Sequence, residues 1–313
     1  MKKFLLDICR IPLAFALAIA VLSCIAYRTE MKAVRRAFAC PPNVLAAAVG
    51  DSRVETAFDP EEIPWLRNYG KAAMPIGVTA QKAKLIVECN PSLQLLVVDI
   101  WPKQFFSDLS KPFASNGLPA PKGLALIETM TREYMPPIGD GFEVRFKNDV
   151  LLPGLKRLLG LKKKAKNPIV GRFVKNRKFL KDHTTGKWRF GAPKTPESFP
   201  KTPADGEIVL DDLLAWLTSR NVKVVLTTTP ILWYEKRYSP EAREYFDRRM
   251  REIAAKHGVR WFNWLDEYQD RMDYWADGCH LNDIGAKAFS NAIKNELAAC
   301  LSGGDKRSLG VKP

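Results

Sequence analysis

After residue 40, the chain alternates between short apolar runs and longer segments in which apolar side chains recur every three or four positions. The apolar runs lack the polar alternation of a half-exposed strand, which indicates strands covered on both faces. They span residues 44–49, 93–100 and 222–228, with a further extended run at 259–264. The helical segments are residues 79–88, 210–220, 240–257 and 283–301. Strands alternating with helices predict an α/β fold, a three-layer sandwich with a central parallel sheet.

The apolar segment at the N-terminus is of a different kind. Residues 11–27 carry no charge and follow a short basic leader, which is typical of a membrane or export segment, although about 20 residues are the usual span. Three alternatives stay open: an uncleaved signal anchor, a cleaved signal peptide, and a lipoprotein whose cleavage box ends at Cys24. Basic residues flank both ends, so the positive-inside rule does not fix the orientation. We expect a single-pass anchor in the cytoplasmic membrane.

The chain is strongly basic, with a formal net charge of +15 at pH 7. Most of this charge lies between Lys156 and Lys201, where fifteen Lys and Arg residues stand against two acids, Asp182 and Glu197, for a net charge of +13. The charge, together with many Pro and Gly residues, predicts a basic insertion over about residues 107–206. It could be a solvated face, or it could bind an anionic membrane surface, an anionic envelope polymer or single-stranded nucleic acid. The membrane segment argues against nucleic acid.

A turn with reactive side chains follows the first core strand. The run 44–49 ends in Gly50-Asp51-Ser52-Arg53. One interpretation is a plain turn in which Asp51 or Ser52 caps the next helix. The other is a presented serine nucleophile, which needs a base to take its proton and a carboxylate to orient that base.

Three histidines could supply that base. His257 stands at the predicted end of a helix, where a cation is stabilising, and His183 lies in a basic, loop-like stretch. His280 follows Asp277 by three residues, and a carboxylate on the same tight turn can fix the tautomer of an imidazole. A structural alternative exists: Asp277-Gly278 is also typical of a plain turn, with Asn282 or Asp283 as the cap of the following helix.

Taken together, the two motifs resemble those of the SGNH, or GDSL-like, hydrolase superfamily. Gly50-Asp51-Ser52 stands after the first core strand and Asp277-x-x-His280 just before the last helix, as the family's first and last motif blocks do. The resemblance covers residues 44–300 apart from the insertion, and it implies the flavodoxin-like SGNH fold. It also implies that Ser52 is the nucleophile, His280 the general base and then acid, and Asp277 its orienting carboxylate.

The resemblance further implies an oxyanion hole formed by the amides of Ser52 and of a glycine in a second block. Arg67-Asn68-Tyr69-Gly70 is similar to that block, which makes Gly70 the candidate donor. The third block departs from the family, since Asp99-Ile100-Trp101-Pro102 stands where an asparagine is expected. Arg53 would either contact an anionic substrate or form a salt bridge at the surface, and we favour the surface salt bridge.

No metal or organic cofactor is expected, because the chain shows no histidine cluster, no paired metal spacing of cysteines and no phosphate-binding glycine loop. The predicted function is an envelope-associated serine esterase or O-acyltransferase acting on an acyl ester of a cell-envelope glycan or polymer. Similarity to the membrane-anchored DltD-like and alginate-acetylation branch implies this substrate class and a catalytic domain outside the cytoplasmic membrane. The altered third block leaves an alternative, a non-catalytic protein of this fold that binds an anionic polymer or membrane surface.

The predicted organisation has three parts. Residues 1–36 form the membrane or signal segment with a basic juxtamembrane stretch, residues 37–301 the catalytic domain with its insertion, and residues 302–313 a flexible tail.

Overall fold

The computed structural model of the chain describes residues 2–107, 128, 142–161, 170–176, 193–198 and 204–302. The chain divides into two compact units. One comprises Met1–Ala39 with Ala120–Ile169, and the other comprises Cys40–Pro119 with Val170–Pro313. Most of the predicted insertion, and the predicted tail from residue 303 onward, lie outside the described residues.

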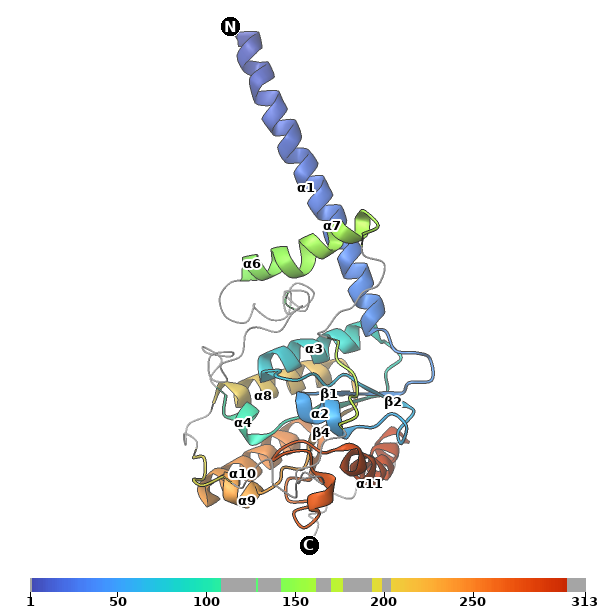
Figure 1. The fold of residues 1–313 in the computed structure, drawn as a ribbon, viewed down its shortest axis with the longest axis vertical. Coiled ribbons are helices and arrows are strands. Elements are labelled where there is room, and N and C mark those ends of the chain that lie inside the picture. The colour runs from blue at the N-terminus through green and yellow to red at the C-terminus, as the bar shows by residue number, and fades with distance from the viewer. Residues whose placement is uncertain are drawn as a thin grey trace, which may run out of the picture. The chain divides into compact units, whose positions relative to one another are not determined.

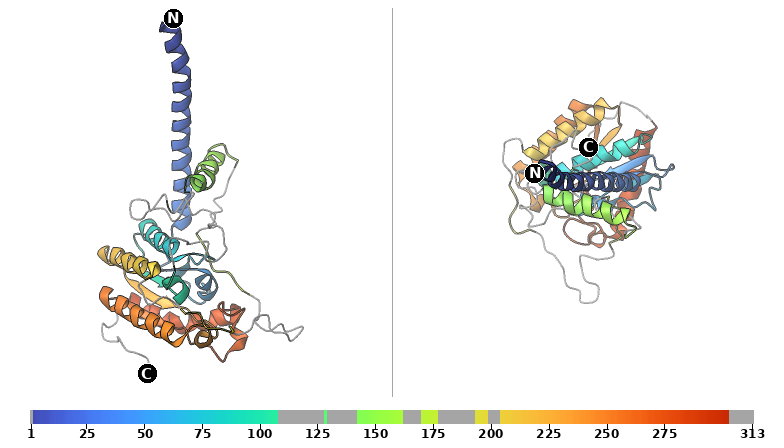
Figure 2. Two further views of the ribbon diagram at one scale, coloured as in Figure 1. Left: turned by 90° about the vertical axis from the view of Figure 1, so that its left-hand side faces the viewer. Right: turned by 90° about the horizontal axis from the view of Figure 1, so that it is seen from above.

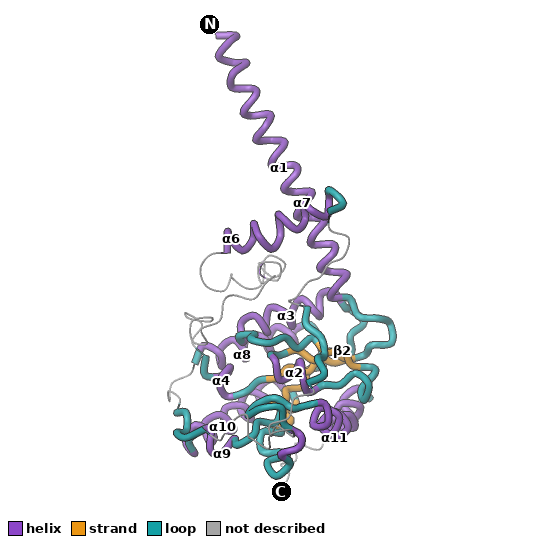
Figure 3. The backbone as a smooth tube through the Cα atoms, in the orientation of Figure 1, coloured by secondary structure: helices purple, strands orange, loops and turns teal. Residues whose placement is uncertain are grey.

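The larger unit is built on a five-stranded sheet (Figures 1 and 3). Its strands are β1 (Ala46–Val49), β2 (Leu66–Asn68), β3 (Leu95–Asp99), β4 (Val224–Thr228) and β5 (Arg260–Asn263). Neighbouring strands are parallel and follow the order β2-β1-β3-β4-β5, which is the flavodoxin-like order. Strands β1, β3 and β4 are buried along their whole length, as their continuous apolar runs predict. The predicted α/β fold with a central parallel sheet is confirmed.

Helices cover both faces of this sheet (Figures 1 and 2). On one face, α2 and α11 pack together and add Val54 and Phe289 to a core cluster with Ala46 and Val97 of the strands. Neighbouring strand residues point to the opposite face, where α8 contacts both α3 and α10. The helical elements of this unit are α2 (Ser52–Ala57), α3 (Ile76–Cys89), α4 (Pro102–Phe105), α8 (Asp205–Ser219), α9 (Tyr234–Arg237), α10 (Pro240–His257), a 3-10 turn (Met272–Tyr274) and α11 (Asp283–Leu301).

The smaller unit consists of a long N-terminal helix and a helical segment that crosses it (Figure 1). The elements are α1 (Lys2–Phe38), α6 (Phe142–Phe146), a π-helical turn (Lys147–Leu151) and α7 (Leu152–Leu158). At the crossing, a Cβ atom on Gly154 would collide with the carbonyl oxygen of Ala26, so glycine permits the close approach. Beside it, Arg157 Nε lies 2.8 Å from Glu30 Oε2 in an ion pair that is largely buried.

The middle and the end of α1 have different surroundings. The stretch over residues 15–25 exposes large apolar side chains, namely Phe15, Leu17, Ile19, Val21, Leu22 and Ile25, whereas farther along the helix Met31, Val34 and Phe38 are buried. Among the described residues, α1 holds one stretch long and apolar enough to cross a membrane, Ala14–Phe38. The helix is therefore a candidate membrane anchor or signal sequence.

Candidate active site

Ser52 lies where β1 ends and α2 begins. Asp51 caps α2, because its Oδ1 accepts the amide of Arg53 at 2.9 Å. The N-cap residue of α2 is therefore Asp51, and the hydroxyl of Ser52 is available for another hydrogen bond. Gly50 allows this turn to form, since a Cβ atom there would press on the side chain of Val54 and come within 3.1 Å of Asp99 Cβ.

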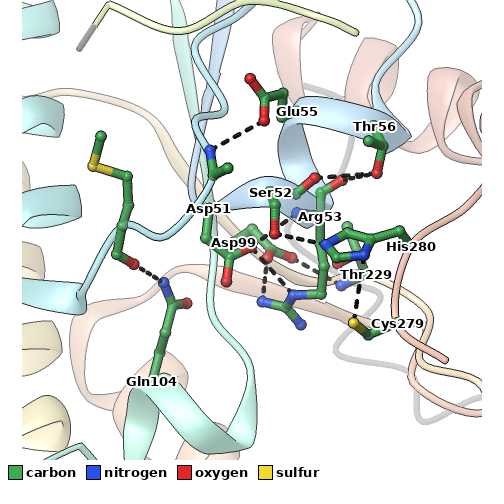
Figure 4. Close-up of polar contacts among 12 residues, drawn as sticks. Asp51, Ser52, Arg53, Glu55, Thr56, Asp99, Gln104, Thr229, Cys279 and His280 are labelled. Atoms are coloured by element: carbon green, nitrogen blue, oxygen red, sulfur yellow. Dashed lines mark hydrogen bonds and ion pairs between the residues drawn. The ribbon is translucent and has the colours of Figure 1, made fainter. Parts of the chain in front are cut away.

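Three side chains named from the sequence come together at this point. Ser52 Oγ lies 2.7 Å from His280 Nε2, and the two point toward each other from α2 and from the turn before α11 (Figure 4). On the far side of the ring, His280 Nδ1 lies 2.8 Å from Asp277 Oδ2. A nucleophile, a base and an orienting carboxylate in this order have the geometry that nucleophilic catalysis requires.

Hydrogen bonds within the turn fix the position of His280. Asp277 Oδ1 accepts the amides of Cys279 and His280, each at 2.9 Å. The amide of Ala276 donates to the carbonyl of His280 at 2.9 Å, which closes the turn. Asn282 then caps α11 by accepting the amide of Gly285. The predicted turn and helix cap are thus present, and they position the imidazole at the same time.

The electrostatics of the pair favour the charged form of the ring. Burial alone would lower the pKa of His280, but hydrogen bonds with Asp277 and Cys279 outweigh it and raise the pKa to about 10. Burial would raise the pKa of Asp277, yet its hydrogen bond with His280 leaves that pKa below the ordinary value. The site therefore stabilises the imidazolium form of His280.

The position of the site in the sheet is the one expected for this topology. β1 pairs with β2 on one side and with β3 on the other, so the strand order reverses at β1 and β3. In open α/β sheets, ligands bind beyond the carboxyl ends of the strands at such a switch point. Ser52 stands three positions after Val49, the last residue of β1, and therefore lies at that edge.

Arg53 is not at the surface, and the expectation of a surface salt bridge is wrong. Only 2% of Arg53 is exposed. Its Nη2 lies 2.8 Å from Asp99 Oδ2 and its Nε 3.3 Å from Asp51 Oδ1, while the guanidinium stacks 4.3 Å from the ring centroid of Trp101. Asp99 Oδ1 also accepts the amide of Thr229 at 2.8 Å. Hydrogen bonds and ion pairs therefore connect the carboxyl ends of strands β1, β3 and β4 next to Ser52.

This network explains the departure of the third motif block. Asp99 and Trp101 stand where the resemblance leads one to expect an oxyanion donor, and both contact Arg53 instead. Burial raises the pKa of Asp99 to about 6, although Arg53 opposes the shift. The sequence offered no local sign of this role, because Asp99 is 46 positions from Arg53.

The predicted oxyanion donor Gly70 has a different partner in the structure. Its amide donates to Asn68 Oδ1 at 2.7 Å, and the residue packs directly on the backbone of α2 at Val54 and Glu55. Among the described residues, no acceptor is paired with the amide of Ser52 at the start of α2. The amide of Ser52 is thus the candidate oxyanion donor without a hydrogen-bond acceptor among the described residues. The amide of Gly70 could donate to an oxyanion only after its hydrogen bond to Asn68 Oδ1 breaks.

The other histidines lie away from this cluster or outside the described part of the chain. His257 ends α10, as predicted, and its Nε2 lies 2.8 Å from Asp211 Oδ1. His183 is outside the described residues. One neighbour that the sequence interpretation did not single out is Cys279, whose Sγ lies 3.5 Å from His280 Nδ1 (Figure 4).

Comparison with known proteins adds little to this picture. No family model and no curated protein matches the chain. A structure provisionally described as a platelet activating factor from Streptococcus pneumonia is 12% identical over 91% of this chain and 99% of that one, with a TM-score of 0.43. A provisionally described acylhydrolase from Bacteroides fragilis is 11% identical over 82% of this chain and 87% of that one, with a TM-score of 0.40. Likeness this distant supports no inference about activity, and the fold assignment rests on the sheet order given above.

Proposed function

We propose that the chain is a membrane-anchored serine esterase or O-acyltransferase of the SGNH type. The observation that supports this most strongly is the continuous path from Ser52 Oγ through His280 to Asp277, at 2.7 Å and 2.8 Å. The path joins residues 228 positions apart in the sequence. Such a distant pairing is not required by either of the two local turns, each of which is complete without it.

The geometry supports a two-step acyl transfer. Ser52 Oγ attacks the acyl carbonyl carbon while His280 Nε2 takes the hydroxyl proton, and Asp277 stabilises the resulting imidazolium. The imidazolium then gives its proton to the departing alkoxide, which leaves an ester on Ser52. In the second step His280 takes a proton from water or from an acceptor hydroxyl, which attacks the ester carbonyl. The bond to Ser52 Oγ then breaks, and the imidazolium returns the proton to that oxygen, which frees Ser52. Water would release a carboxylic acid, and a sugar hydroxyl would accept the acyl group.

The oxyanion of each tetrahedral intermediate needs at least one positioned donor. The amide of Ser52 at the start of α2 is the first proposed donor. The Gly70 amide would be the second, after exchanging the side-chain oxygen Oδ1 of Asn68 for the oxyanion. Loss of one such donor typically costs about 3–4 kcal/mol of transition-state stabilisation.

The location and substrate class are proposed from the smaller unit and from the charge. The exposed apolar stretch of α1 over residues 15–25 would lie in the cytoplasmic membrane, with the catalytic unit on its outer side. On α7, Leu152 and Leu155 are exposed and Leu159 follows at the helix end, which places three leucines on one stripe that suits a lipid surface. With a net charge of +15, the chain would be attracted to an anionic membrane surface or to an acylated, anionic envelope polymer.

A non-catalytic binding protein of the same fold is the second candidate. It is favoured by the third block, where Asp99 and Trp101 hold Arg53 and supply no oxyanion donor. This candidate predicts a folded protein that binds anionic polymer without turning over any ester.

The experiment that separates the two candidates is hydrolysis of a small activated acyl ester by the full-length chain in mild detergent. We expect turnover that is lost in Ser52→Ala and retained in Ser219→Ala, which changes an exposed serine at the end of α8. Addition of sugar acceptors would then distinguish transfer from hydrolysis by the appearance of an acylated sugar. Equal turnover by wild type and Ser52→Ala would refute the proposal.

A further inference from the structure

The turn that carries the catalytic histidine also presents three different metal ligands. Asp277, Cys279 and His280 each offer one ligand atom, and these atoms lie within 4.8 Å of one another. All three side chains are half-buried, so an ion could reach them from solvent. Oδ1 of Asp277 is used by two backbone amides, which leaves Oδ2 as the oxygen available to a cation.

Two of the three distances between these atoms can be compared with those of a tetrahedral zinc site. With Zn–S of about 2.3 Å and Zn–N or Zn–O of about 2.0–2.1 Å, tetrahedral angles place nitrogen and sulfur about 3.6 Å apart and nitrogen and oxygen about 3.3 Å apart. In the structure, Cys279 Sγ lies 3.5 Å from His280 Nδ1, and Asp277 Oδ2 lies 2.8 Å from the same nitrogen. The sulfur-to-nitrogen distance already fits, and the carboxylate, which lies within 4.8 Å of the sulfur, would move by about half an ångström from the nitrogen to admit the ion.

We propose that Asp277, Cys279 and His280 form an inhibitory site for Zn²⁺ or a similar thiolate-binding divalent ion, with water in the fourth position. Thiolate together with imidazole selects zinc over magnesium or calcium, which prefer oxygen ligands. Binding releases the thiol proton of Cys279. It also displaces the proton that His280 Nδ1 shares with Asp277; the neutral ring takes up a proton at Nε2 instead, so that the lone pair of Nδ1 binds the metal. The metal thereby occupies the ring nitrogen that the carboxylate of Asp277 otherwise orients.

The consequence for Ser52 follows from the tautomer, and this step rests on the proposed function. A ring metallated at Nδ1 carries its remaining proton on Nε2, the nitrogen 2.7 Å from Ser52 Oγ. That nitrogen then donates to the hydroxyl and cannot accept its proton. The metal-bound site would hold Ser52 without activating it, and removal of the ion would restore the base.

The metal site is tested without reference to activity by adding Co²⁺ to the full-length, metal-free chain at mildly alkaline pH, where protons compete less for the ligands. We expect a thiolate-to-cobalt charge-transfer band in the near ultraviolet that Zn²⁺ abolishes. Cys279→Ser and Cys279→Ala should lack the band. Cys300→Ser should keep it, because Cys300 lies near the other end of α11, about 25 Å along the helix from its start.

The inhibition is tested on the same samples with a fluorophosphonate serine probe. Zn²⁺ should suppress labelling of wild type and of Cys300→Ser. Loss of an outer-shell partner alone typically weakens metal binding by about 10–100-fold. Cys279→Ser loses a direct ligand, so it should need at least about 100-fold more Zn²⁺ for the same effect, compared with its own metal-free labelling. Thermal melting of each variant confirms that it is folded.

The outcomes separate the metal site from the proposed function. A cobalt band that depends on Cys279, in a chain that the probe never labels, would support the metal site and refute the esterase. Probe labelling without any Cys279-dependent band, or equal zinc sensitivity in wild type and Cys279→Ser, would overturn the metal site and leave the esterase standing.

Discussion

Replacement of Arg53 by methionine tests the network of buried side chains next to Ser52. Methionine keeps much of the length and apolar contact of the side chain and removes its charge. The carboxylate of Asp99, which is 0% exposed, would then lose its partner at 2.8 Å. Removing one member of a buried ion pair typically costs about 3–5 kcal/mol. At about 3 kcal/mol, the melting temperature of a unit of this size falls by roughly 6–12 °C.

A second substitution should reverse part of this loss. Asp99→Asn removes the buried charge and keeps an oxygen for the amide of Thr229. In the double variant Arg53→Met with Asp99→Asn, the fully buried charge of Asp99 is gone and only Asp51 lacks its longer ion pair of 3.3 Å. The double variant should therefore be more stable than Arg53→Met alone by about 1–3 kcal/mol. Arg271→Met is the matched control, because its ion pair with Asp273 is exposed and such pairs contribute about 0–1 kcal/mol.

The pH dependence gives an independent check on the same pair. Burial raises the pKa of Asp99 from 3.8 to about 6, so between these values the folded chain holds a proton that the unfolded chain releases. This carboxyl group therefore stabilises the fold most at low pH, and its contribution falls as pH rises through about 6. The penalty of Arg53→Met should accordingly shrink when melting is measured at pH 5 instead of pH 8. Additive losses in the double variant, with a penalty independent of pH, would refute the network as described.

Three further results are expected. The rate of ester hydrolysis should rise with pH through a midpoint above 6.5, because only neutral His280 can accept a proton and its hydrogen bonds raise its pKa. Asp277→Asn removes one of these bonds, so it should lower the midpoint of a pH–rate profile recorded with a chelator. Gly154→Val should speed hydrogen exchange in α7, since its Cβ would collide with the carbonyl of Ala26, and unchanged exchange would contradict the close crossing. Ser290→Ala removes a fully buried hydroxyl that bonds two backbone groups after α2, so unfolding should become easier by about 1–3 kcal/mol, and an unchanged melting temperature would count against that role.

Strands with long apolar runs could be predicted from the sequence. A strand that forms only because it pairs with a neighbouring strand could not. β1, β3 and β4 come from runs of buried side chains whose pattern is visible in the sequence. β2 is three residues long, Leu66–Asn68, and carries an arginine and an asparagine. It becomes a strand because it pairs with β1 at the edge of the sheet, and no local pattern indicates that.

The candidate site shows the same division between local and distant causes. The turns at Ser52 and His280 could be predicted, since each is closed by side chains within three positions. The burial of Arg53 could not, because arginine is ordinarily exposed and its partner Asp99 belongs to another strand. The bond from the Gly70 amide to Asn68 spans only two residues and is of a kind that asparagine often makes, so it could have been anticipated.

The central claim is that Ser52 is an activated nucleophile, and covalent labelling tests it most directly. The full-length chain in detergent, with chelator present, is treated with a fluorophosphonate probe, digested and analysed by mass spectrometry. The account predicts one adduct on Ser52 that is absent from Ser52→Ala, strongly reduced in His280→Ala and retained in Ser219→Ala. A folded wild-type chain without any adduct on Ser52, or an adduct that forms equally well in His280→Ala, would contradict it.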